Sequence, residues 1–325
     1  MMKTVLVTGA AGYIGSVLVN KLLGEGHSVV GLDNLSFGGE SLLSVFNHPN
    51  FQLMQGDVRN PDDLDRALEN VDSVVHLAAI VGDPACAKDP ELTKSINLTA
   101  TLDLFARAEK VPNVKRFIFA STCSNYGRME DQAICTEISA LNPVSLYAET
   151  KVAVEKAIFE TKTRKNFTST VLRFSTVYGV GPRMRFDLTV NDFVREVVLG
   201  RELVVFGEQF WRPYCHVEDL ARSCIHVLKA DPAKVNKEVF GVGSTDENYQ
   251  KQMIVDEMLK QIPDMKVSYV QKNEDPRDYR VDFTKISEQL DFEISRRVPD
   301  GIREVKELLE LGMLIDPMAK HYGNT

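Results

Sequence analysis

Short apolar runs alternate with amphipathic stretches through the first half of the chain. The continuous apolar runs predict buried strands, which lie at 4–8, 27–33, 51–58, 73–79 and 116–121. Apolar residues at helical spacing predict the intervening helices, which lie at 15–23, 61–68 and 91–109. Strands that alternate with helices predict an α/β fold, a doubly wound parallel sheet covered by helices on both faces.

The pattern changes near residue 170. The stretch 170–179 still predicts a strand, but the segments that follow are shorter and interrupted by Pro and Gly. We therefore expect a first domain at 1–170 and a smaller C-terminal α/β lobe at 171–325. The strand near 171–178 is expected to return to the first sheet.

Composition and charge argue against nucleic acids and membranes as partners of this chain. The chain has 325 residues and a net charge of −8, which argues against a nucleic-acid surface because such surfaces need clustered Lys and Arg. No apolar run is long enough to cross a bilayer, and no signal peptide precedes the first strand, so we expect a cytoplasmic protein without membrane contact. The five cysteines are widely spaced, so we predict neither disulfides nor a metal site.

A glycine motif occupies the first predicted turn. Gly9, Gly12 and Gly15 form G-x-x-G-x-x-G directly after a strand and at the start of a helix. The first glycine permits the tight turn, the second lets the backbone approach a pyrophosphate, and the third lets helix and strand pack closely. The unpaired N–H groups of the helix start favour phosphate. The motif therefore predicts a Rossmann-type dinucleotide site.

Three further strand ends fit that site. Asp33 ends the next strand, about 20 residues after the motif, as a ribose-binding carboxylate requires. No Arg follows Asp33 directly, and a carboxylate repels a 2′-phosphate, so NAD is favoured over NADP. Asp57 is a candidate for the adenine amino group, while the small Ala78 and Ala79 let the backbone run along the cofactor.

Candidate catalytic chemistry lies between residues 121 and 151. Tyr147 and Lys151 are four residues apart and share one face of a predicted helix. We predict that the Lys151 ammonium and the positive nicotinamide ring lower the pKa of Tyr147, which would make it a general base. The hydroxyls of Thr122 and Ser124 are placed to hold a substrate oxygen beside it.

The chain resembles the extended short-chain dehydrogenase/reductase family, in particular the NAD-dependent nucleotide-sugar epimerases and dehydratases. The resemblance rests on TGAAGYIGS, DNL, GDVRN, HLAA, INLTAT, FIFASTCSNYG, YAETK, LRFSTVYGVGPR and RPYCHVEDLA, which occur in the family's order. It implies Thr122 as the catalytic hydroxyl, Tyr147 as the base and Lys151 as the ligand of the nicotinamide ribose. It also places further residues at the NAD site, namely Tyr13, Ile14, Asn34, Val58, Leu77, Asn97 and Phe174.

The resemblance also points to a substrate site in the second lobe. Arg212 matches the arginine that holds the nucleotide diphosphate, and Arg277 is a weaker match because the spacing around it differs. Arg183 and Arg185 lie in a stretch similar to a bacterial subgroup that oxidises C4 of GDP-heptoses, which makes them candidates for sugar or phosphate contacts. Thr176 stands where the family commonly has Asn and is a further substrate candidate.

One departure from the family narrows the reaction. The 4,6-dehydratases carry Asp-Glu directly after the catalytic Thr, and the decarboxylases usually keep the Glu, whereas this chain has Cys123 and Ser124. We therefore expect an NAD-dependent nucleotide-diphosphate-sugar 4-epimerase of polysaccharide biosynthesis. The alternatives are a net C4 dehydrogenase or 4-keto reductase, with GDP-heptose as one possible substrate, and a non-catalytic NAD-binding regulatory protein. The family also implies a homodimer built on the predicted helices at 91–109 and 147–161.

Overall fold

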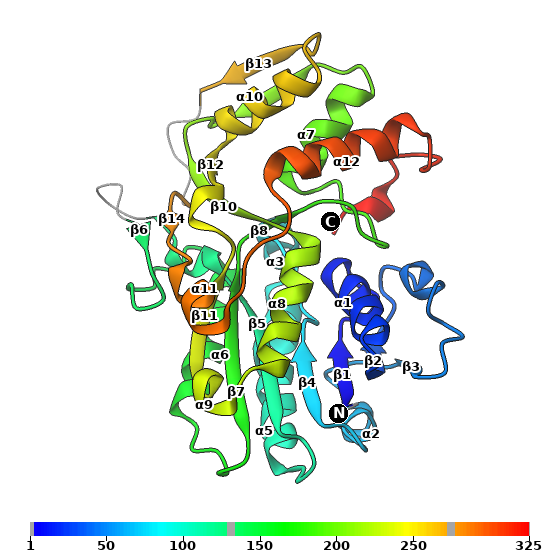
Figure 1. Cartoon of the computed structure of the whole chain (residues 1–325), viewed down its shortest axis with the longest axis vertical. Coiled ribbons are helices and arrows are strands. Elements are labelled where there is room, and N and C mark those ends of the chain that lie inside the picture. The colour runs from blue at the N-terminus through cyan, green and yellow to red at the C-terminus, as the bar shows by residue number, and fades with distance from the viewer. Residues whose placement is uncertain (1–2, 129–133, 272–276, 325) are drawn as a thin grey trace.

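A seven-stranded parallel sheet forms the centre of the protein, in the order β11-β7-β5-β4-β1-β2-β3 (Figure 1). The computed structural model describes residues 3–128, 134–271 and 277–324. The strands of the sheet are β1 (Thr4–Thr8), β2 (Ser28–Asp33), β3 (Phe51–Gln55), β4 (Ser73–His76), β5 (Arg116–Thr122), β7 (Thr168–Phe174) and β11 (Glu238–Val242). The strand order reverses between β1 and β4, which is where sheets of this class bind ligands.

Helices cover both faces of the sheet because its strands bury side chains on both sides. Val5 and Val7 belong to the core on one face, and Leu6 between them belongs to the core on the other. The first face is covered by α1 (Tyr13–Gly24), α8 (Val217–Lys229) and α11 (Thr284–Leu290). The second is covered by α2 (Pro61–Ala67), α5 (Thr101–Lys110) and α6 (Leu146–Glu160). The doubly wound fold class is therefore confirmed.

Two predicted elements differ in the structure. The helix predicted at 91–109 is divided into α4 (Pro90–Lys94), a π-helical segment η2 (Ser95–Ala100) and α5. The strand predicted at 170–179 is divided at Ser175, whose N–H and hydroxyl both donate to the Val242 carbonyl. This turn ends β7 in the large sheet and sends β8 (Thr176–Tyr178) into a different one.

The second lobe is built from short strands and three helices around their own core. Its sheets comprise β8, β10 (Trp211–His216) and β12 (Asn248–Gln250), then β9 (Leu203–Phe206) with β13 (Val267–Val270), and β6 (Ile134–Cys135) with β14 (Arg280–Val281). Its helices are α7 (Thr189–Val198), α10 (Lys251–Gln261) and α12 (Val298–Glu310). The shorter helix α3 (Asp83–Lys88) lies between β4 and β5 in the chain, and α9 (Pro232–Val235) lies between α8 and β11.

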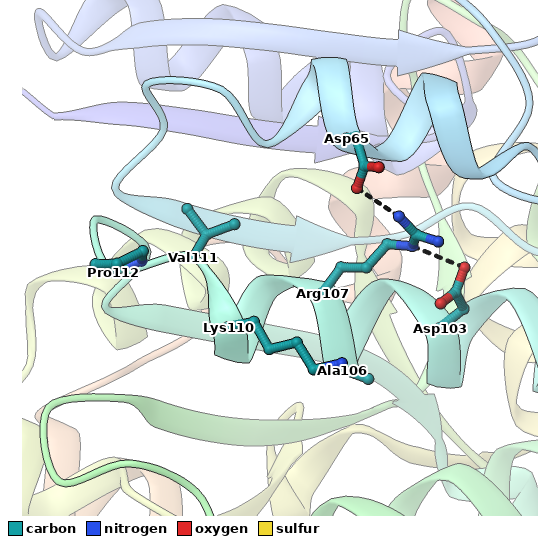
Figure 2. Close-up of a pocket in the computed structure, with 7 residues that line it drawn as sticks. All are labelled: Asp65, Asp103, Ala106, Arg107, Lys110, Val111 and Pro112. Carbon is teal, nitrogen blue, oxygen red and sulfur yellow. Dashed lines mark hydrogen bonds and ion pairs between the residues drawn. The ribbon is translucent and has the colours of Figure 1, made fainter.

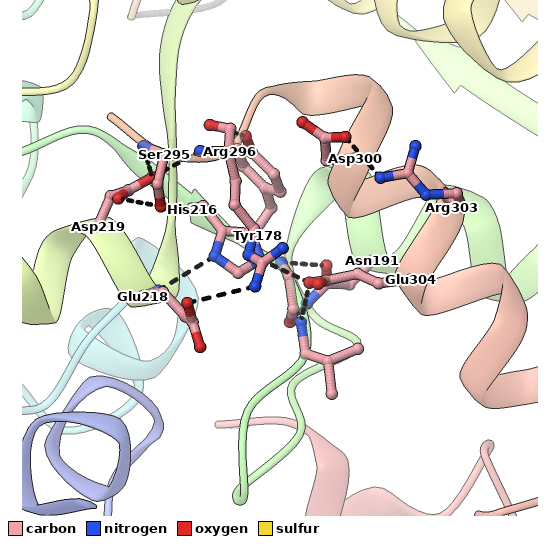
Figure 3. Close-up of polar contacts among 12 residues, drawn as sticks. Tyr178, Asn191, His216, Glu218, Asp219, Ser295, Arg296, Asp300, Arg303 and Glu304 are labelled. Carbon is pink, nitrogen blue, oxygen red and sulfur yellow. Dashed lines mark hydrogen bonds and ion pairs between the residues drawn. The ribbon is translucent and has the colours of Figure 1, made fainter. Parts of the chain in front are cut away.

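Polar contacts join the two lobes where the chain crosses between them (Figure 3). Asp219 on α8 accepts hydrogen bonds from the Ser295 N–H and hydroxyl at 2.9 and 2.8 Å. His216 Nε2 lies 2.5 Å from Glu304 Oε1 of α12. The range 171–325 that we assigned to the second lobe also supplies β11, α8 and α11 to the large sheet, so the chain crosses between the lobes more than once.

Three findings concern membrane spans, metal clusters and cysteines in the part of the chain that the structure describes. Across 3–128, 134–271 and 277–324, no helix is both long and apolar enough to cross a membrane. Within these same ranges, no group of three or more His, Cys, Asp or Glu side chains could hold a metal ion. All five cysteines are buried and free.

A buried imidazole connects the sheet to α5. His76 Nδ1 lies 2.7 Å from Thr8 Oγ1, and His76 Nε2 lies 2.9 Å from Thr101 Oγ1. Burial lowers the pKa of His76 to about 3, so the imidazole is neutral in the folded protein at neutral pH. Below pH 6.5 the unfolded chain binds a proton that the folded protein does not, and stability is lost as the pH falls.

We predict that His76→Gln removes this part of the acid sensitivity. The wild-type free energy of unfolding should fall by ~1.4 kcal/mol more per pH unit than that of the variant between pH 6 and pH 4. Urea unfolding at a series of pH values measures both slopes. His321→Gln, which removes an exposed imidazole, is the control and should keep the wild-type slope. Parallel curves for the wild type and His76→Gln would contradict the prediction.

Candidate active site

The predicted cofactor residues converge at the carboxyl ends of the strands. They follow β1 (Gly9, Gly12, Tyr13, Ile14 and Gly15), end or follow β2 and β3 (Asp33, Asn34, Asp57 and Val58), and follow β4 (Leu77, Ala78 and Ala79). Phe174 ends β7, and Thr122 ends β5. Because the strands are parallel, these ends lie along one edge of the sheet.

The glycine turn is packed too closely for side chains. Gly9 has a φ of +71°, and a Cβ there would lie 2.9 Å from the Ala78 backbone nitrogen. A Cβ on Gly15 would collide with the Gly9 carbonyl oxygen. Gly12 is the N-cap of α1, and no side chain caps this helix, so its first N–H groups are available to an anion. The turn therefore fits the pyrophosphate of NAD.

Asp33 is held in place by backbone donors. Its two carboxylate oxygens accept from the Ala11 N–H at 2.9 Å and the Leu35 N–H at 2.8 Å. Burial raises its pKa, while these two hydrogen bonds lower it. Each oxygen retains a lone pair for a ribose hydroxyl. The Asp57 carboxylate is instead bound by the Arg59 guanidinium, with Arg59 Nη2 at 2.6 Å, and this ion pair lowers the pKa of Asp57.

The π-helical segment explains why Asn97 matters to the site. Asn97 Oδ1 accepts from the Ile80 N–H at 2.8 Å, and its Nδ2 donates to the Ile80 carbonyl at 2.9 Å. The Asn97 side chain is buried. Its amide pairs with both backbone groups of Ile80 in the loop that follows β4, as a neighbouring strand would. π-Bulges recur at functional sites in other helices. Here the bulge fixes the loop that carries Leu77, Ala78 and Ala79.

The structure brings the three predicted catalytic residues together. The Thr122 hydroxyl lies near enough to the Tyr147 phenol to lower its pKa. Lys151 Nζ lies 5.8 Å from the centre of the Tyr147 ring and donates to the Ala120 carbonyl at 2.8 Å. Ser145 caps the start of α6, where its hydroxyl accepts from the Ala148 N–H at 3.4 Å, and so fixes the first turn that carries Tyr147.

The predicted lowering of the Tyr147 pKa by Lys151 and a bound nicotinamide ring stays a prediction, and in the chain by itself the pKa of Tyr147 is raised. Burial raises the pKa of Tyr147 above its ordinary value, and the nearby Cys86 and Asp83 raise it further. Arg185 and the Thr122 hydroxyl lower it, but by less than burial raises it. Burial also lowers the pKa of Lys151 to about 8. Desolvation therefore opposes the phenolate–ammonium pair.

A buried ion pair lies directly behind these residues. Glu155 and Arg173 have side chains only 2% and 4% exposed, and Arg173 Nη2 lies 2.7 Å from Glu155 Oε2. Glu155 Oε1 also accepts from the Ser121 hydroxyl and from Asn125 Nδ2. We did not predict this network, although Glu155 continues the four-residue spacing of Tyr147 and Lys151. An arginine inside the apolar strand β7 was a second available signal.

The predicted substrate side of the site combines residues from both lobes. The Ser124 hydroxyl lowers the pKa of the nearby Tyr279 phenol, and the Arg212 guanidinium lies 5.4 Å from the centre of the Tyr279 ring. Arg277 Nη1 forms an ion pair with Asp83 at 3.1 Å, between the second lobe and α3. Thr176 opens β8 and pairs with β10, the strand that carries Arg212. The geometry therefore groups Ser124, Arg212 and Arg277.

Arg183 and Arg185 lie in different surroundings. Arg185 is buried against Asp187, with Arg185 Nη2 2.7 Å from Asp187 Oδ2, and its charge acts on the Tyr147 phenol. Arg183 instead acts electrostatically on Asp33. The structure thus brings Arg185 to the catalytic end and Arg183 to the ribose end of the candidate NAD site.

A separate pocket lies between α2 and α5 (Figure 2). Arg107 crosses it and joins Asp65 at 2.5 Å and Asp103 at 2.9 Å. The pocket continues along α5 to Pro112, which shortly precedes the first residue of β5. It therefore belongs to the amino ends of the strands, at the opposite edge of the sheet from Tyr147.

Comparison with known proteins agrees with this geometry. The model of the NAD dependent epimerase/dehydratase family matches residues 5–243. An uncharacterised UDP-glucose epimerase of Bacillus subtilis is 32% identical over 69% of this chain and 72% of its own length. A UDP-glucuronate 4-epimerase of Thermodesulfobacterium geofontis is 28% identical over 94% of this chain and 97% of its own.

Solved structures show the same similarity. A UDP-glucose 4-epimerase of Thermotoga maritima, crystallised with UDP-glucose, has a TM-score of 0.84 and 26% identity, over 96% of this chain and 100% of its own. A UDP-glucuronic acid 4-epimerase of Bacillus cereus, in complex with UDP-glucuronic acid and NAD, has a TM-score of 0.83 and 25% identity, over 95% and 99%.

We predict that Glu155→Gln destabilises the protein by ~3–5 kcal/mol, because it leaves the buried Arg173 charge without a counter-charge. Chemical denaturation at pH 7 measures the loss. The paired replacement Glu155→Leu with Arg173→Met removes both charges, and it should recover most of the stability. Loss below about 1 kcal/mol in Glu155→Gln would show that the pair does not hold the site together.

Proposed function

Because this chain belongs to the NAD-dependent epimerase/dehydratase family, we propose that it is a nucleotide-diphosphate-sugar 4-epimerase acting through a transient 4-keto sugar. The family assignment makes it an NAD-dependent enzyme of nucleotide-sugar chemistry. The observation that carries the proposal is the convergence of Thr122, Tyr147 and Lys151 at the carboxyl end of β5, where the Thr122 hydroxyl lowers the Tyr147 pKa and Lys151 Nζ lies 5.8 Å from the Tyr147 ring centre. This arrangement supports a role for Thr122 and Tyr147 in binding a hydroxyl group of the sugar.

Each residue of this group has a separate part in the proposed reaction. The Thr122 and Tyr147 oxygens together hold the C4 hydroxyl of the sugar, and Tyr147 accepts its proton. Lys151 binds the nicotinamide ribose, and its ammonium and the Arg185 guanidinium favour the phenolate. When bound, NAD⁺ supplies the hydride acceptor and a positive ring beside the phenol. Epimerisation then requires the 4-keto sugar to turn over before hydride returns to its other face.

The residues after Thr122 favour epimerisation over elimination. Loss of a C6 hydroxyl needs its own acid and base, which the resembled dehydratases provide as Asp-Glu. Here Cys123 is buried and its thiol donates to the Arg173 carbonyl, while the Ser124 hydroxyl acts on the Tyr279 phenol. Burial raises the pKa of Cys123 above its ordinary value, so this thiol is not an acid or base at neutral pH.

The substrate is proposed to bind across the lobe boundary. Arg212 is the candidate for the diphosphate, since a guanidinium suits bidentate phosphate contacts. Arg277 and Asp83 form an ion pair at the same opening, so a diphosphate that engages Arg277 would compete with this carboxylate. The proposal names neither the sugar nor the nucleotide base of the substrate. The homodimer, the cytoplasmic location and the role in polysaccharide biosynthesis stay predictions from the sequence.

A second reaction stays a candidate on the same geometry. Net C4 dehydrogenation or 4-keto reduction uses the same Thr122, Tyr147 and Lys151 but needs NAD to exchange at every turnover. The stretch 182–193 favours this candidate, because it resembles enzymes that oxidise C4 of GDP-heptoses. A regulatory protein without catalysis would not need the intact Thr122–Tyr147 pair.

Tyr147→Phe tests the proposed base. We expect a loss of roughly 10²–10⁴ in turnover, because the proton acceptor is gone, with little change in NAD affinity. The assay incubates the protein with UDP-, GDP-, CDP- and dTDP-sugars and follows C4 by NMR. Tyr269→Phe, a change on the partly exposed strand β13, is the matched control. Turnover by Tyr147→Phe at the wild-type rate would refute the assignment.

Retention of NAD separates the two reactions. An epimerase returns its hydride to the sugar, so purified protein should carry bound NAD(H) and convert substrate without added cofactor. A net dehydrogenase should release one NADH per sugar oxidised and stop when free NAD⁺ is exhausted. Gel filtration followed by cofactor quantification and NADH absorbance during turnover distinguish these outcomes, and stoichiometric NADH release would contradict the epimerase.

A further inference from the structure

The segment from Gly179 to Asp187 crosses over the glycine turn of the candidate NAD site. The Tyr13 phenol, inside the glycine motif, donates to the Gly179 carbonyl. A Cβ added at Gly181 would lie 3.0 Å from the Tyr13 ring, so the backbone of the segment packs closely on this ring. Asn191 Nδ2 also donates to the Tyr13 hydroxyl at 3.2 Å. The segment is therefore fastened to the phosphate-binding turn.

The same segment is fixed to the second lobe at its start (Figure 3). The Val180 N–H donates to Glu304 Oε1 on α12 at 2.6 Å, and the Gly179 N–H donates to Asn191 Oδ1 at 2.9 Å. Glu304 also meets His216 at 2.5 Å. These anchors fix the path of the chain just before it reaches Arg183.

Arg183 extends from this segment to the ribose end of the site. Its guanidinium carbon lies 4.1 Å from the centre of the Phe37 ring, which belongs to the loop after β2. Its charge acts on Asp33, the ribose-binding candidate. Arg183 Nε is buried and has no hydrogen-bond partner. The structure thus holds an unused donor next to the place where a ribose would bind.

Residues 322–324 hold Arg183 from the other side. Arg183 Nη2 donates to Asn324 Oδ1 at 2.8 Å and to the Gly323 carbonyl at 3.3 Å. The Phe186 N–H donates to the Tyr322 carbonyl at 2.7 Å. This short stretch therefore lies along the segment and orients the guanidinium across the site.

We propose that Arg183, stacked on Phe37 and held by residues 322–324, is a clasp over the adenosine end of NAD that slows release of the cofactor. A planar guanidinium can cover the ribose while its Nε donates to a ribose or phosphate oxygen. Adenosine then leaves only after the Arg183–Phe37 contact opens. The inference rests on the NAD site and holds whether the C4 reaction is epimerisation or net oxidation.

This inference reassigns Arg183, which we predicted to bind the substrate. Arg185, two residues later, acts on the Tyr147 phenol and remains the candidate for the sugar end. Arg183 shares its surroundings with Asp33 and Phe37 instead. The two arginines of one loop therefore act on different groups, Arg183 on Asp33 and Arg185 on Tyr147.

Arg183→Gln tests the clasp through cofactor release. Protein loaded with NADH is mixed with excess NAD⁺, and the decay of bound NADH fluorescence gives the dissociation rate. We expect this rate to rise about tenfold or more, since the stacked contact and the charge are both lost. Arg303→Gln removes an exposed guanidinium on α12 and should release NADH at the wild-type rate.

Two further variants separate the clasp from damage to the fold. Phe37→Leu removes the stacking partner, and Asn324→Ala removes the outer hydrogen bond, so both should speed release less than Arg183→Gln does. The melting temperature without cofactor should stay close to wild type in all three. An unchanged NADH dissociation rate in Arg183→Gln, with a raised KM for the sugar, would overturn the clasp in favour of substrate binding. Failure of the epimerase proposal would appear separately, as absence of C4 inversion in wild-type protein that retains NAD.

Discussion

The buried ion pair between Glu155 and Arg173 is the interaction on which the candidate active site depends. It joins α6 to β7, and through the Ser121 hydroxyl it also holds the end of β5. Taking both charges out of water costs several kcal/mol, which only close and saturated hydrogen bonding can offset. Glu155 accepts from Arg173, Ser121 and Asn125, so that condition is met. Thr122 follows Ser121, and Lys151 lies one helical turn before Glu155. The network therefore fixes the relative positions of Thr122 and Lys151.

A second constraint connects the glycine turn to the second lobe. The Tyr13 phenol lies in the glycine motif and donates to the carbonyl of Gly179, which directly follows β8 of the second lobe. Burial raises the pKa of Tyr13, so the phenol stays a neutral donor. A lobe that moved away from the sheet would have to break this buried bond. The glycine turn and the loop of Arg183 and Arg185 are therefore connected by buried hydrogen bonds.

The strands, the glycine turn and the Tyr147–Lys151 pair could be predicted because each is encoded by residues close together in the chain. The π-helical segment could not be predicted, because it depends on the hydrogen bond between Asn97 and Ile80, which lies 17 residues earlier in the chain. The division of 170–179 depends on Ser175 binding Val242, a partner much later in the chain. The location of Arg183 depends likewise on Phe37 and Asn324. Local patterns predict elements, but contacts between distant segments decide where their side chains lie.

The proposed base Tyr147 depends on the charges around it, because burial disfavours its phenolate form. Burial raises the pKa of the phenol and lowers that of Lys151 to about 8, so both groups favour their neutral forms. Glu155, one turn beyond Lys151, raises the Lys151 pKa and so helps to keep the ammonium charged near neutral pH. The ammonium in turn favours the phenolate once a further positive charge lies beside the ring. In the proposed reaction, Glu155 acts on the proton transfer only through the charge of Lys151.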